Sequence, residues 1–334
     1  MVLKKVSILI AARNEAANIL DCLRALAALS YPAQHLQILI GDDASEDETA
    51  ALIEEFIGEK PHFKLVRITA TVTALKGKTN VLAQLAHHAT GEYLFFTDAD
   101  IEVPTDWIQN MLAAFKPNVG VVTGITTMKP HQKMVSFGDL QGLEWLYYLS
   151  FVRLFSLFEI PLTAMGNNMA VTRQAYDAVG GYENIGFSIT EDYALFRAIL
   201  SKGFRFAQLF DRRVLTLSTP IPTFGALLMQ RKRWMYGAMS LPWQQRLGVY
   251  FNGLLLPFLV ILGFLFPQIA LWLTFAGYVG VTAWVAGILS WLSLSRAWVA
   301  LPVFWFYHVG MNFAMLLNFY LQKQTVWKGR TYDQ

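Results

Sequence analysis

The sequence predicts an α/β domain with a doubly wound, mostly parallel sheet, followed by C-terminal transmembrane helices. Short apolar runs alternate with helical patterns through about residue 240, and this alternation is typical of a parallel sheet covered by helices. The 334 residues are 54% hydrophobic and only 15% charged, below the quarter or so that is usual in soluble domains. Much of that deficit lies beyond residue 246, where we expect the chain to enter a membrane.

The elements of the α/β domain can be placed in order. We expect strands over residues 6–10, 37–41, 63–68 and 92–97, a helix ending near residue 29, and helices over 48–57, 79–89 and 193–201. Ligands of such sheets bind outside the carboxyl ends of the strands. Asn14, Asp43 and Asp98 follow three of these strands, so we predict that they meet in one crevice.

Two long segments near the C-terminus contain no Asp, Glu, Lys or Arg: residues 247–295 and 297–322. A spanning helix needs about 20 apolar residues, so the first segment has room for two spans and the second for one. In soluble proteins, the apolar positions that face the core alternate along the chain with charged positions that face water. We therefore expect an integral membrane protein, and its compact form fits a bacterial inner (plasma) membrane.

The α/β domain itself is expected in the cytoplasm, because the apolar run at residues 6–10 is too short for a signal peptide or a first span. Basic residues precede the spans, as the positive-inside tendency expects of a cytoplasmic flank: Arg212, Arg213, Arg231, Lys232, Arg233 and Arg246. Three spans would put the tail, with Lys323, Lys328 and Arg330, on the far side. Either the tail is tolerated there, or one segment is re-entrant or interfacial.

Two further segments have membrane-surface character. Residues 140–162 are rich in aromatic residues and poor in charge, which favours an interfacial helix; by composition alone an ordinary core helix fits equally well. Residues 222–240 form the second expected interfacial helix, with Arg231 and Lys232 directed at lipid headgroups. The expected domains are a catalytic domain over 1–240, a transmembrane region over 247–322 and a tail over 323–334.

Composition excludes other classes of protein. The single cysteine, Cys22, excludes a disulfide framework and a cysteine metal cluster. No stripe of basic and aromatic residues indicates a nucleic-acid partner. The remaining chemical signal is Asp98-Ala99-Asp100, two carboxylates at a strand's end that could hold a divalent cation and leave positions for phosphate oxygens. Taken alone, this pattern is more often a solvated turn.

An ordered set of motifs resembles the family 2 glycosyltransferases over roughly residues 5 to 240. Those of the nucleotide-sugar half are Ala12-Arg13-Asn14-Glu15, residues 42–47, Gly77-Lys78 and Asp98-Ala99-Asp100; those of the acceptor half are residues 166–170, 190–192 and 230–234. The last is a Q-x-x-R-W element, typical of membrane-bound members such as cellulose and hyaluronan synthases and ceramide glucosyltransferase. The resemblance implies a glycosyltransferase A-type fold.

The resemblance implies a nucleotide-sugar donor, a UDP-sugar. Asp43 would accept the uracil N–H, with Asp42 beside it, and Asn14 and Glu15 would line the same base pocket. Considered without the resemblance, Asp42 also fits the ordinary role of an aspartate in a turn.

Lys78 would serve the ribose-phosphate region, where Lys76 fits as well and a solvated surface lysine is the rival reading. The family often has Leu-Asn where this chain has Leu82-Ala83, so any contact from that Asn is absent. Asp100 would be the direct ligand of Mg²⁺ or Mn²⁺, and Asp98 would contact the ribose and the water shell of the metal.

The acceptor half would supply the base. The resemblance implies that Glu191 and Asp192 are the catalytic residues, with Asp192 deprotonating the acceptor hydroxyl. Without the resemblance, the same residues fit the capped start of a helix. Gln230, Arg233 and Trp234 share one helix face and would bind the diphosphate and the sugar or acceptor. Gly166 and Asn167 would allow close approach of the donor sugar, or form a simple turn.

The expected function is a metal-dependent, inverting transfer of a sugar to a lipid or polyprenoid hydroxyl at the membrane surface. The runner-up is a processive β-linked polysaccharide synthase, with a glycan acceptor. A third possibility is a membrane-anchored scaffold with a degenerate domain. Product partitioning between organic and aqueous phases would separate the first two, and release of nucleoside diphosphate would exclude the third.

Overall fold

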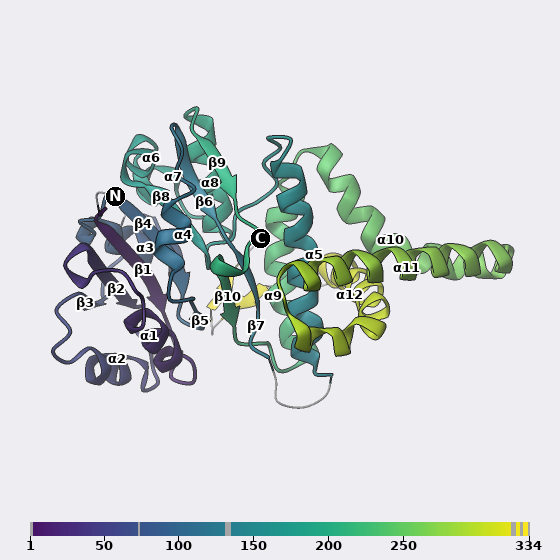
Figure 1. Ribbon diagram of the computed structural model, residues 1–334, viewed down its shortest axis with the longest axis horizontal. Coiled ribbons are helices and arrows are strands. Elements are labelled where there is room, and N and C mark those ends of the chain that lie inside the picture. Colours follow the sequence, from purple (N-terminus) through teal and green to yellow (C-terminus); the bar gives the residue numbers. More distant parts are fainter. Residues whose placement is uncertain (1–2, 73, 131–134, 322–324, 328–329, 333–334) are drawn as a thin grey trace. The chain divides into compact units, whose positions relative to one another are not determined.

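The computed structural model describes residues 3–72, 74–130, 135–321, 325–327 and 330–332 (Figure 1). The chain divides into two compact units. The first contains residues 1–126 and 151–219, and the second contains residues 127–150 and 220–334. Lys323 and Lys328 of the expected tail lie outside the described residues. Each unit is described by itself.

The first unit is built on a seven-stranded sheet with the order β3-β2-β1-β4-β8-β6-β9. Its strands are β1 (Val6–Ala12), β2 (Leu36–Asp42), β3 (Phe63–Arg67), β4 (Tyr93–Asp98), β6 (Val119–Thr123), β8 (Met169–Thr172) and β9 (Arg205–Gln208). β8 runs antiparallel to β4 and β6, and the other pairings are parallel. The predicted doubly wound, mostly parallel sheet is confirmed.

The central strands are buried on both faces, which is why they read as continuous apolar runs. Alternate residues of β1 serve different cores: Ile8 and Ile10 face one, and Leu9 faces the other. Gly91 precedes β4 where a Cβ would lie 2.4 Å from the backbone nitrogen of Ser7, so only glycine fits there.

Helices cover both faces of this sheet. One core includes α1 (Ile19–Ala27), α2 (Thr49–Ile57) and α4 (Trp107–Leu112). The opposite core includes α3 (Gly77–His88), α6 (Arg173–Ala178), α7 (Gly181–Ile185) and α8 (Glu191–Ser201). Short 3-10 helices occupy Ala33–His35 and Arg212–Val214. A three-stranded sheet has the order β5 (Ile101–Glu102), β10 (Leu215–Ser218), β7 (Ile125–Met128).

The second unit is mainly helical. Its helices are α9 (Phe224–Met239), α10 (Trp243–Leu265), α11 (Pro267–Trp291), the 3-10 helix Ser295–Ala300 and α12 (Leu301–Leu321), together with most of α5 (Phe137–Ser156). The strands β11 (Thr325–Trp327) and β12 (Arg330–Tyr332) pair antiparallel. Leu143 of α5 packs with Val285 and Leu289 of α11 and with Phe304 of α12.

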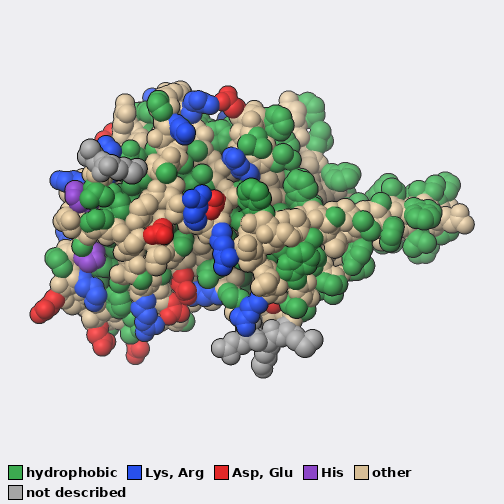
Figure 2. Space-filling view, viewed as in Figure 1, with side chains coloured by type: hydrophobic (Ala, Val, Ile, Leu, Met, Phe, Trp, Pro, Cys, Tyr) green, Lys and Arg blue, Asp and Glu red, His purple; other side chains and the backbone are tan. Residues whose placement is uncertain are grey.

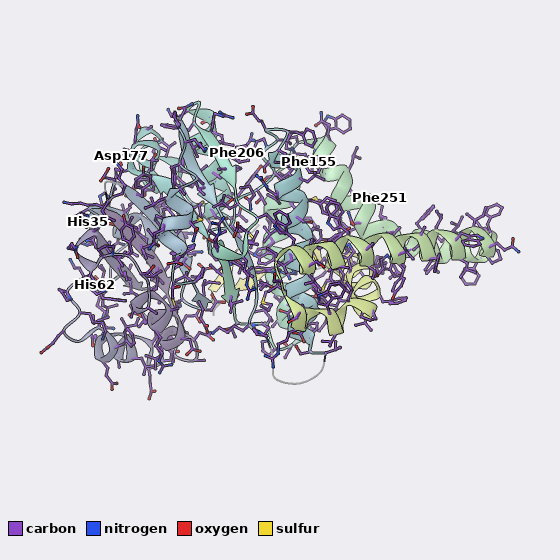
Figure 3. The ribbon with its side chains drawn as sticks, viewed as in Figure 1. His35, His62, Phe155, Asp177, Phe206 and Phe251 are labelled. Carbon is purple, nitrogen blue, oxygen red and sulfur yellow. The ribbon has the colours of Figure 1, made fainter. Side chains whose placement is uncertain are left out.

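Three helices of the described chain are long and apolar enough to cross a membrane: Trp243–Leu265, Pro267–Trp291 and Ser295–Leu321. Their number agrees with the three predicted spans. Hydrophobic side chains gather over α10 and α11 in Figure 2. Phe251 of α10, labelled in Figure 3, is 70% exposed, and Trp272 of α11 is equally exposed at 70%. Exposed apolar surface on this scale is typical of contact with lipid.

The expectation that Arg231 and Lys232 face lipid headgroups is wrong. Both side chains are buried within the second unit, Arg231 at 2% and Lys232 at 0% exposure. The physical reason is the charge inside the unit: Glu144 of α5 forms an ion pair with Arg231 at 2.6 Å. Glu144, Trp145 and Leu146 are themselves buried, as they would be in a core helix. Whether α5 also lies at a membrane surface stays a prediction.

Candidate active site

The strand register brings the predicted donor-site segments to one edge of the sheet. Asp98, at the end of β4, pairs with Ala11 of β1. Asp42, at the end of β2, pairs with Ala12 of β1. The loop that holds Asn14 and the loop that holds Asp43 therefore leave the sheet beside each other. The strand order reverses across β1, which is where ligands of doubly wound sheets bind.

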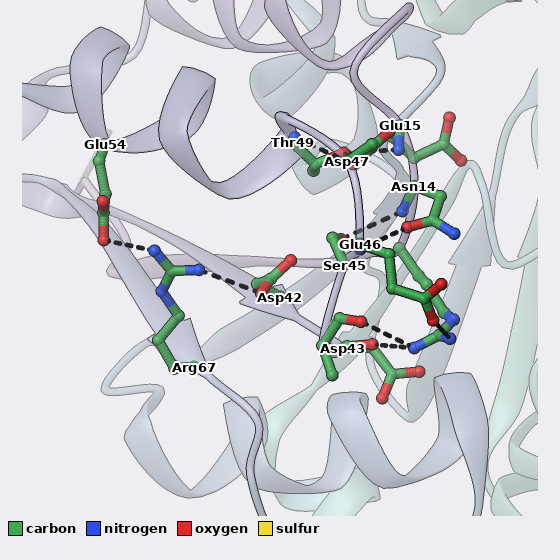
Figure 4. Close-up of polar contacts among 12 residues, drawn as sticks. Asn14, Glu15, Asp42, Asp43, Ser45, Glu46, Asp47, Thr49, Glu54 and Arg67 are labelled. Carbon is green, nitrogen blue, oxygen red and sulfur yellow. Dashed lines mark hydrogen bonds and ion pairs between the residues drawn. The ribbon is translucent and has the colours of Figure 1, made fainter.

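Hydrogen bonds tie these two loops together (Figure 4). The backbone N–H of Asn14 donates to Ser45 Oγ at 3.1 Å, and the N–H of Glu46 donates to Asn14 Oδ1 at 2.9 Å. Asn14 has a φ of 51°, in the left-handed region that Asn tolerates better than most residues. Glu15 is also engaged, since its N–H donates to Thr49 Oγ1 at 2.7 Å. Asn14 thus shapes the edge of the predicted base pocket.

Asp42 and Asp43 occupy different surroundings. Asp42 is buried and accepts a hydrogen bond from Arg67 Nη1 at 3.3 Å (Figure 4). The backbone carbonyl of Asp43 accepts a hydrogen bond from Arg13 Nη1 at 2.6 Å. The Arg13 side chain therefore fixes the backbone at Asp43.

Lys78 lies in the first turn of α3, after Gly77, whose φ of 55° favours glycine. Its Nζ lies 2.6 Å from Asp98 Oδ1 and 2.8 Å from Glu191 Oε1. Burial alone would lower the pKa of Lys78, but the Asp98 and Glu191 carboxylates raise it above its ordinary value, so the side chain is an ammonium. Lys78 therefore links the Asp-x-Asp segment to the start of α8.

Asp192 is the second residue of α8, beside Glu191. Its Oδ2 accepts a hydrogen bond from the N–H of Gly166 at 2.7 Å. A Cβ on Gly166 would lie 2.9 Å from Asp192 Cβ, so this approach requires glycine. Removal from bulk water and the Glu191 carboxylate raise the pKa of Asp192 to about 6, against the opposing effect of Lys78. A carboxylate with that pKa suits general-base work near neutral pH.

The Asp98 and Asp100 carboxylates follow β4, and Asp100 Oδ2 accepts a hydrogen bond from Ser218 Oγ of β10 at 2.8 Å. Among the described residues, no group of three or more His, Cys, Asp or Glu side chains is arranged to hold a metal alone. Mg²⁺ commonly binds through one or two carboxylates together with substrate phosphates. Asp98 and Asp100 offer carboxylates of the kind that such a cation binds.

The Gly166-Asn167-Asn168 turn is locked into the sheet. The Asn167 carbonyl accepts a hydrogen bond from Thr97 Oγ1 at 3.1 Å. Asn168 is fully buried; its Nδ2 donates to the carbonyls of Ile125 and Val214, each at 2.8 Å. Sequence reasoning missed Ser218 and the structural role of Asn168. Ser218 belongs to no motif. Asn168 lies within the 166–170 motif, but its contacts, like that of Ser218, are to partners distant in sequence.

Gln230, Arg233 and Trp234 lie on α9 of the second unit and are half-buried. The guanidinium carbon of Arg231 lies 4.2 Å from the Trp234 ring centroid. The rings of Trp145 and Trp234 have centroids 5.3 Å apart, at 54°. Trp234 is therefore held from two sides and keeps part of its surface open.

The fold is that of a glycosyltransferase domain. A model of glycosyl transferase family 21 matches residues 3–333, and the chain belongs to that family. The predicted resemblance to family 2 glycosyltransferases is confirmed at the level of a glycosyltransferase, and the family is family 21.

Relatives of this chain and a solved structure support the same class of enzyme. The β-monoglucosyldiacylglycerol synthase of Trichormus variabilis is 31% identical over 242 residues, 70% of this chain and 48% of that protein. The poly-β-1,6-N-acetyl-D-glucosamine synthase of Staphylococcus epidermidis is 30% identical over 236 residues, 70% of this chain and 54% of that protein. The chain thus spans about half the length of these curated relatives.

A mannosyltransferase from Pyrobaculum calidifontis, solved in complex with GDP-Man and Mn²⁺, has a TM-score of 0.60 and 18% identity. The match covers 95% of this chain and 87% of that one. At this identity the likeness concerns the fold, and it confirms the predicted fold class.

Proposed function

We propose that this protein is a metal-dependent, inverting glycosyltransferase that moves a sugar from a UDP-sugar to a lipid or polyprenoid hydroxyl at the membrane surface. One observation carries the proposal. Lys78 bridges Asp98 and Glu191 at 2.6 and 2.8 Å, so the predicted donor carboxylates and the predicted base form one cluster. A relative named as a glucosyldiacylglycerol synthase supports the lipid acceptor.

On the donor side, the Asp43 carboxylate accepts the uracil N–H, and the loop shaped by Asn14 and Glu15 lines the base. Asp100 and Asp98 would hold Mg²⁺ or Mn²⁺, which would supply Lewis-acid neutralisation of the charge on the departing nucleoside diphosphate. The Lys78 ammonium keeps the Asp98 carboxylate in place and adds positive charge near the phosphates.

On the acceptor side, Asp192 takes the proton of the acceptor hydroxyl. The hydroxyl oxygen then bonds to the anomeric carbon as the bond from that carbon to the diphosphate oxygen breaks. A single displacement inverts the anomeric centre and needs no covalent enzyme intermediate. The N–H groups of Gly166 and Tyr193 donate to Asp192 Oδ2 and Oδ1, at 2.7 and 2.8 Å, and hold the carboxylate in place for this proton transfer.

The Q-x-x-R-W residues have side chains suited to recognising parts of the substrates. Arg233 offers a planar guanidinium for a phosphate, and Gln230 offers an amide for hydroxyls. The exposed part of Trp234 forms a flat wall for the sugar or acceptor. The apolar helices α10, α11 and α12 keep the protein in the bilayer that dissolves a lipid acceptor.

A processive polysaccharide synthase is the second candidate, favoured by the relative named as a poly-N-acetylglucosamine synthase. Product partitioning separates the two. The purified protein is incubated with labelled UDP-sugars and membrane lipids, and the label is extracted. Single-sugar label in the organic phase supports the lipid acceptor; high-mass aqueous label supports the polymer. Absence of UDP release with every donor would support a non-catalytic scaffold.

A further inference from the structure

The second unit contains a charged pair in a helical core. Arg231 of α9 and Glu144 of α5 are 2% and 1% exposed, and Arg231 Nη2 donates to Glu144 Oε2 at 2.6 Å. Taking two charges out of water costs much of what their attraction returns, so a buried ion pair is a poor device for stability alone. An apolar pair of similar volume would pack these helices as well. We therefore looked for a role of this pair in orienting the side chains that it contacts.

Arg231 contacts two residues of the Q-x-x-R-W element. Its Nη1 donates to Gln230 Oε1 at 3.3 Å, and its guanidinium carbon lies 4.2 Å from the Trp234 ring centroid. A guanidinium over an indole face is an attractive arrangement, strongest where water is excluded. Arg231 thus contacts both the amide that the proposed function assigns to hydroxyls and the ring that it assigns to the sugar or acceptor.

Glu144 holds Arg231 from the opposite helix. Its Oε2 also accepts a hydrogen bond from Tyr307 Oη of α12 at 3.2 Å. Trp145, the next residue of α5, packs its ring 5.3 Å from that of Trp234. Side chains of α5 and of a candidate membrane helix therefore converge on one face of α9.

We infer that Arg231, held by Glu144 and Tyr307, is a positioning residue that fixes Gln230 and Trp234 for the acceptor. This inference rests on the proposed function for the acceptor. It extends that function because Tyr307, on the candidate membrane helix α12, supports Glu144 without itself contacting Gln230 or Trp234. The planar guanidinium is needed because it serves Glu144, Gln230 and Trp234 at once, which a lysine ammonium cannot do.

A spectroscopic test is independent of activity. Two indoles at 5.3 Å and 54° give an exciton-coupled circular dichroism signal, which is assigned by its loss in Trp234→Phe. We expect Glu144→Gln and Arg231→Lys in the full-length protein to weaken that signal while the melting temperature shows that the protein is folded. A signal of unchanged strength in folded Glu144→Gln overturns the inference.

A kinetic test uses UDP-glucose and dioleoylglycerol in mixed micelles. Tyr307→Phe removes one hydrogen bond to Glu144, and we expect it to raise the KM for dioleoylglycerol about threefold to tenfold. Its KM for UDP-glucose and its acceptor-free hydrolysis of UDP-glucose should stay as in wild type. The matched control is Tyr148→Phe, which loses a hydrogen bond to Asn312 in the same unit and should keep both KM values.

A charge exchange separates positioning from simple stability. Glu144→Arg with Arg231→Glu restores an ion pair between α5 and α9 but removes the guanidinium from Trp234. We expect the exchange to recover melting temperature and to leave the dioleoylglycerol KM raised. Recovery of both would overturn the inference. If wild type releases UDP yet glucosylates no lipid, the proposed acceptor is wrong, and the dichroism result then decides the positioning role by itself.

Discussion

Four carboxylates and one ammonium share the candidate active site: Asp98, Asp100, Glu191, Asp192 and Lys78. Lys78 lies between Asp98 and Glu191, and Asp192 follows Glu191 in the chain. The excess of negative charge opposes ionisation of each further carboxyl, which is one reason that the pKa of Asp192 is raised. Such a cluster suits a site that receives a divalent cation and releases a proton from an alcohol.

Asp192→Asn keeps the size of the side chain and removes the base. General-base assistance supplies about 10²–10⁴ in rate, so kcat should fall by that factor. Binding of UDP, measured by calorimetry with Mn²⁺, should stay within about twofold of wild type, because Asp192 is assigned to the acceptor. Wild-type turnover in this variant would contradict the assignment of Asp192.

The pH dependence of kcat should report the same carboxyl. Asp192 acts as a base only when ionised, so kcat should fall as the pH drops through about 6. Glu191 raises this pKa and Lys78 lowers it. Glu191→Gln should therefore move the acid limb to lower pH, and Lys78→Met should move it to higher pH. The exposed Glu59→Gln is the control, and one midpoint shared by all variants would refute the electrostatic account.

Ser218→Ala tests the metal pair. The Ser218 hydroxyl donates a hydrogen bond to Asp100 Oδ2 at 2.8 Å. Mutation of a residue that hydrogen-bonds to a metal ligand typically lowers metal affinity by about 10–100-fold. We expect at least a tenfold rise in the Mn²⁺ concentration needed for half-maximal activity, with kcat recovered at saturating metal. Ser201→Ala, at the exposed end of α8, should leave the metal titration unchanged. An unchanged titration in Ser218→Ala would remove Asp100 from the metal site.

At the scale of elements, the N-terminal ends of α3 and α8 supply the central charges, and the turn before β8 supplies their support. Lys78 and Glu191 both lie in first helical turns. The turn residue Gly166 reaches Asp192 because Asn167 and Asn168 lock the turn to neighbouring strands. The positions of these charged groups are therefore set by how the elements pack against one another.

Gly166→Ala should disturb Asp192 without disturbing the fold. The added Cβ would lie 2.9 Å from Asp192 Cβ, so the carboxylate must shift. A misplacement on this scale costs about 10²-fold in rate, and we expect kcat to fall by roughly that much. The melting temperature should change by a few degrees at most. Gly248→Ala, where an added Cβ meets nothing within 4 Å, is the matched control; equal kcat losses in both would contradict the positioning of Asp192 by Gly166.

Local sequence patterns predicted the strands well because burial makes them continuous apolar runs. β1 extends over Val6–Ala12 against an expected 6–10, and β4 over Tyr93–Asp98 against 92–97. The Lys78 ion pairs were not predictable in this way. Such contacts join positions far apart in the chain, as Asp100 and Ser218 do at a separation of 118 residues. No local pattern records a partner at that separation.

The whole molecule combines an α/β unit with a unit of long apolar helices. Charge depletion predicted the three long helices directly, because a membrane-spanning segment is recognised by its apolar composition. The same reasoning wrongly placed Arg231 at the lipid headgroups. Sequence composition does not distinguish an exposed arginine from one that is buried and paired with Glu144. The positions of Asp42 and Asp98 at strand ends were therefore easier to predict than the surroundings of Arg231.

We propose that one cluster transfers a sugar from a UDP-sugar to a membrane lipid. The most direct measurement incubates the full-length protein with a panel of UDP-sugars, Mn²⁺ and extracted membrane lipids, and identifies products by mass spectrometry alongside UDP release. We predict a lipid carrying one added sugar, formed in equal amount to UDP, and absent with Asp192→Asn. A high-mass polymer, or no UDP release from any donor, would contradict the claim.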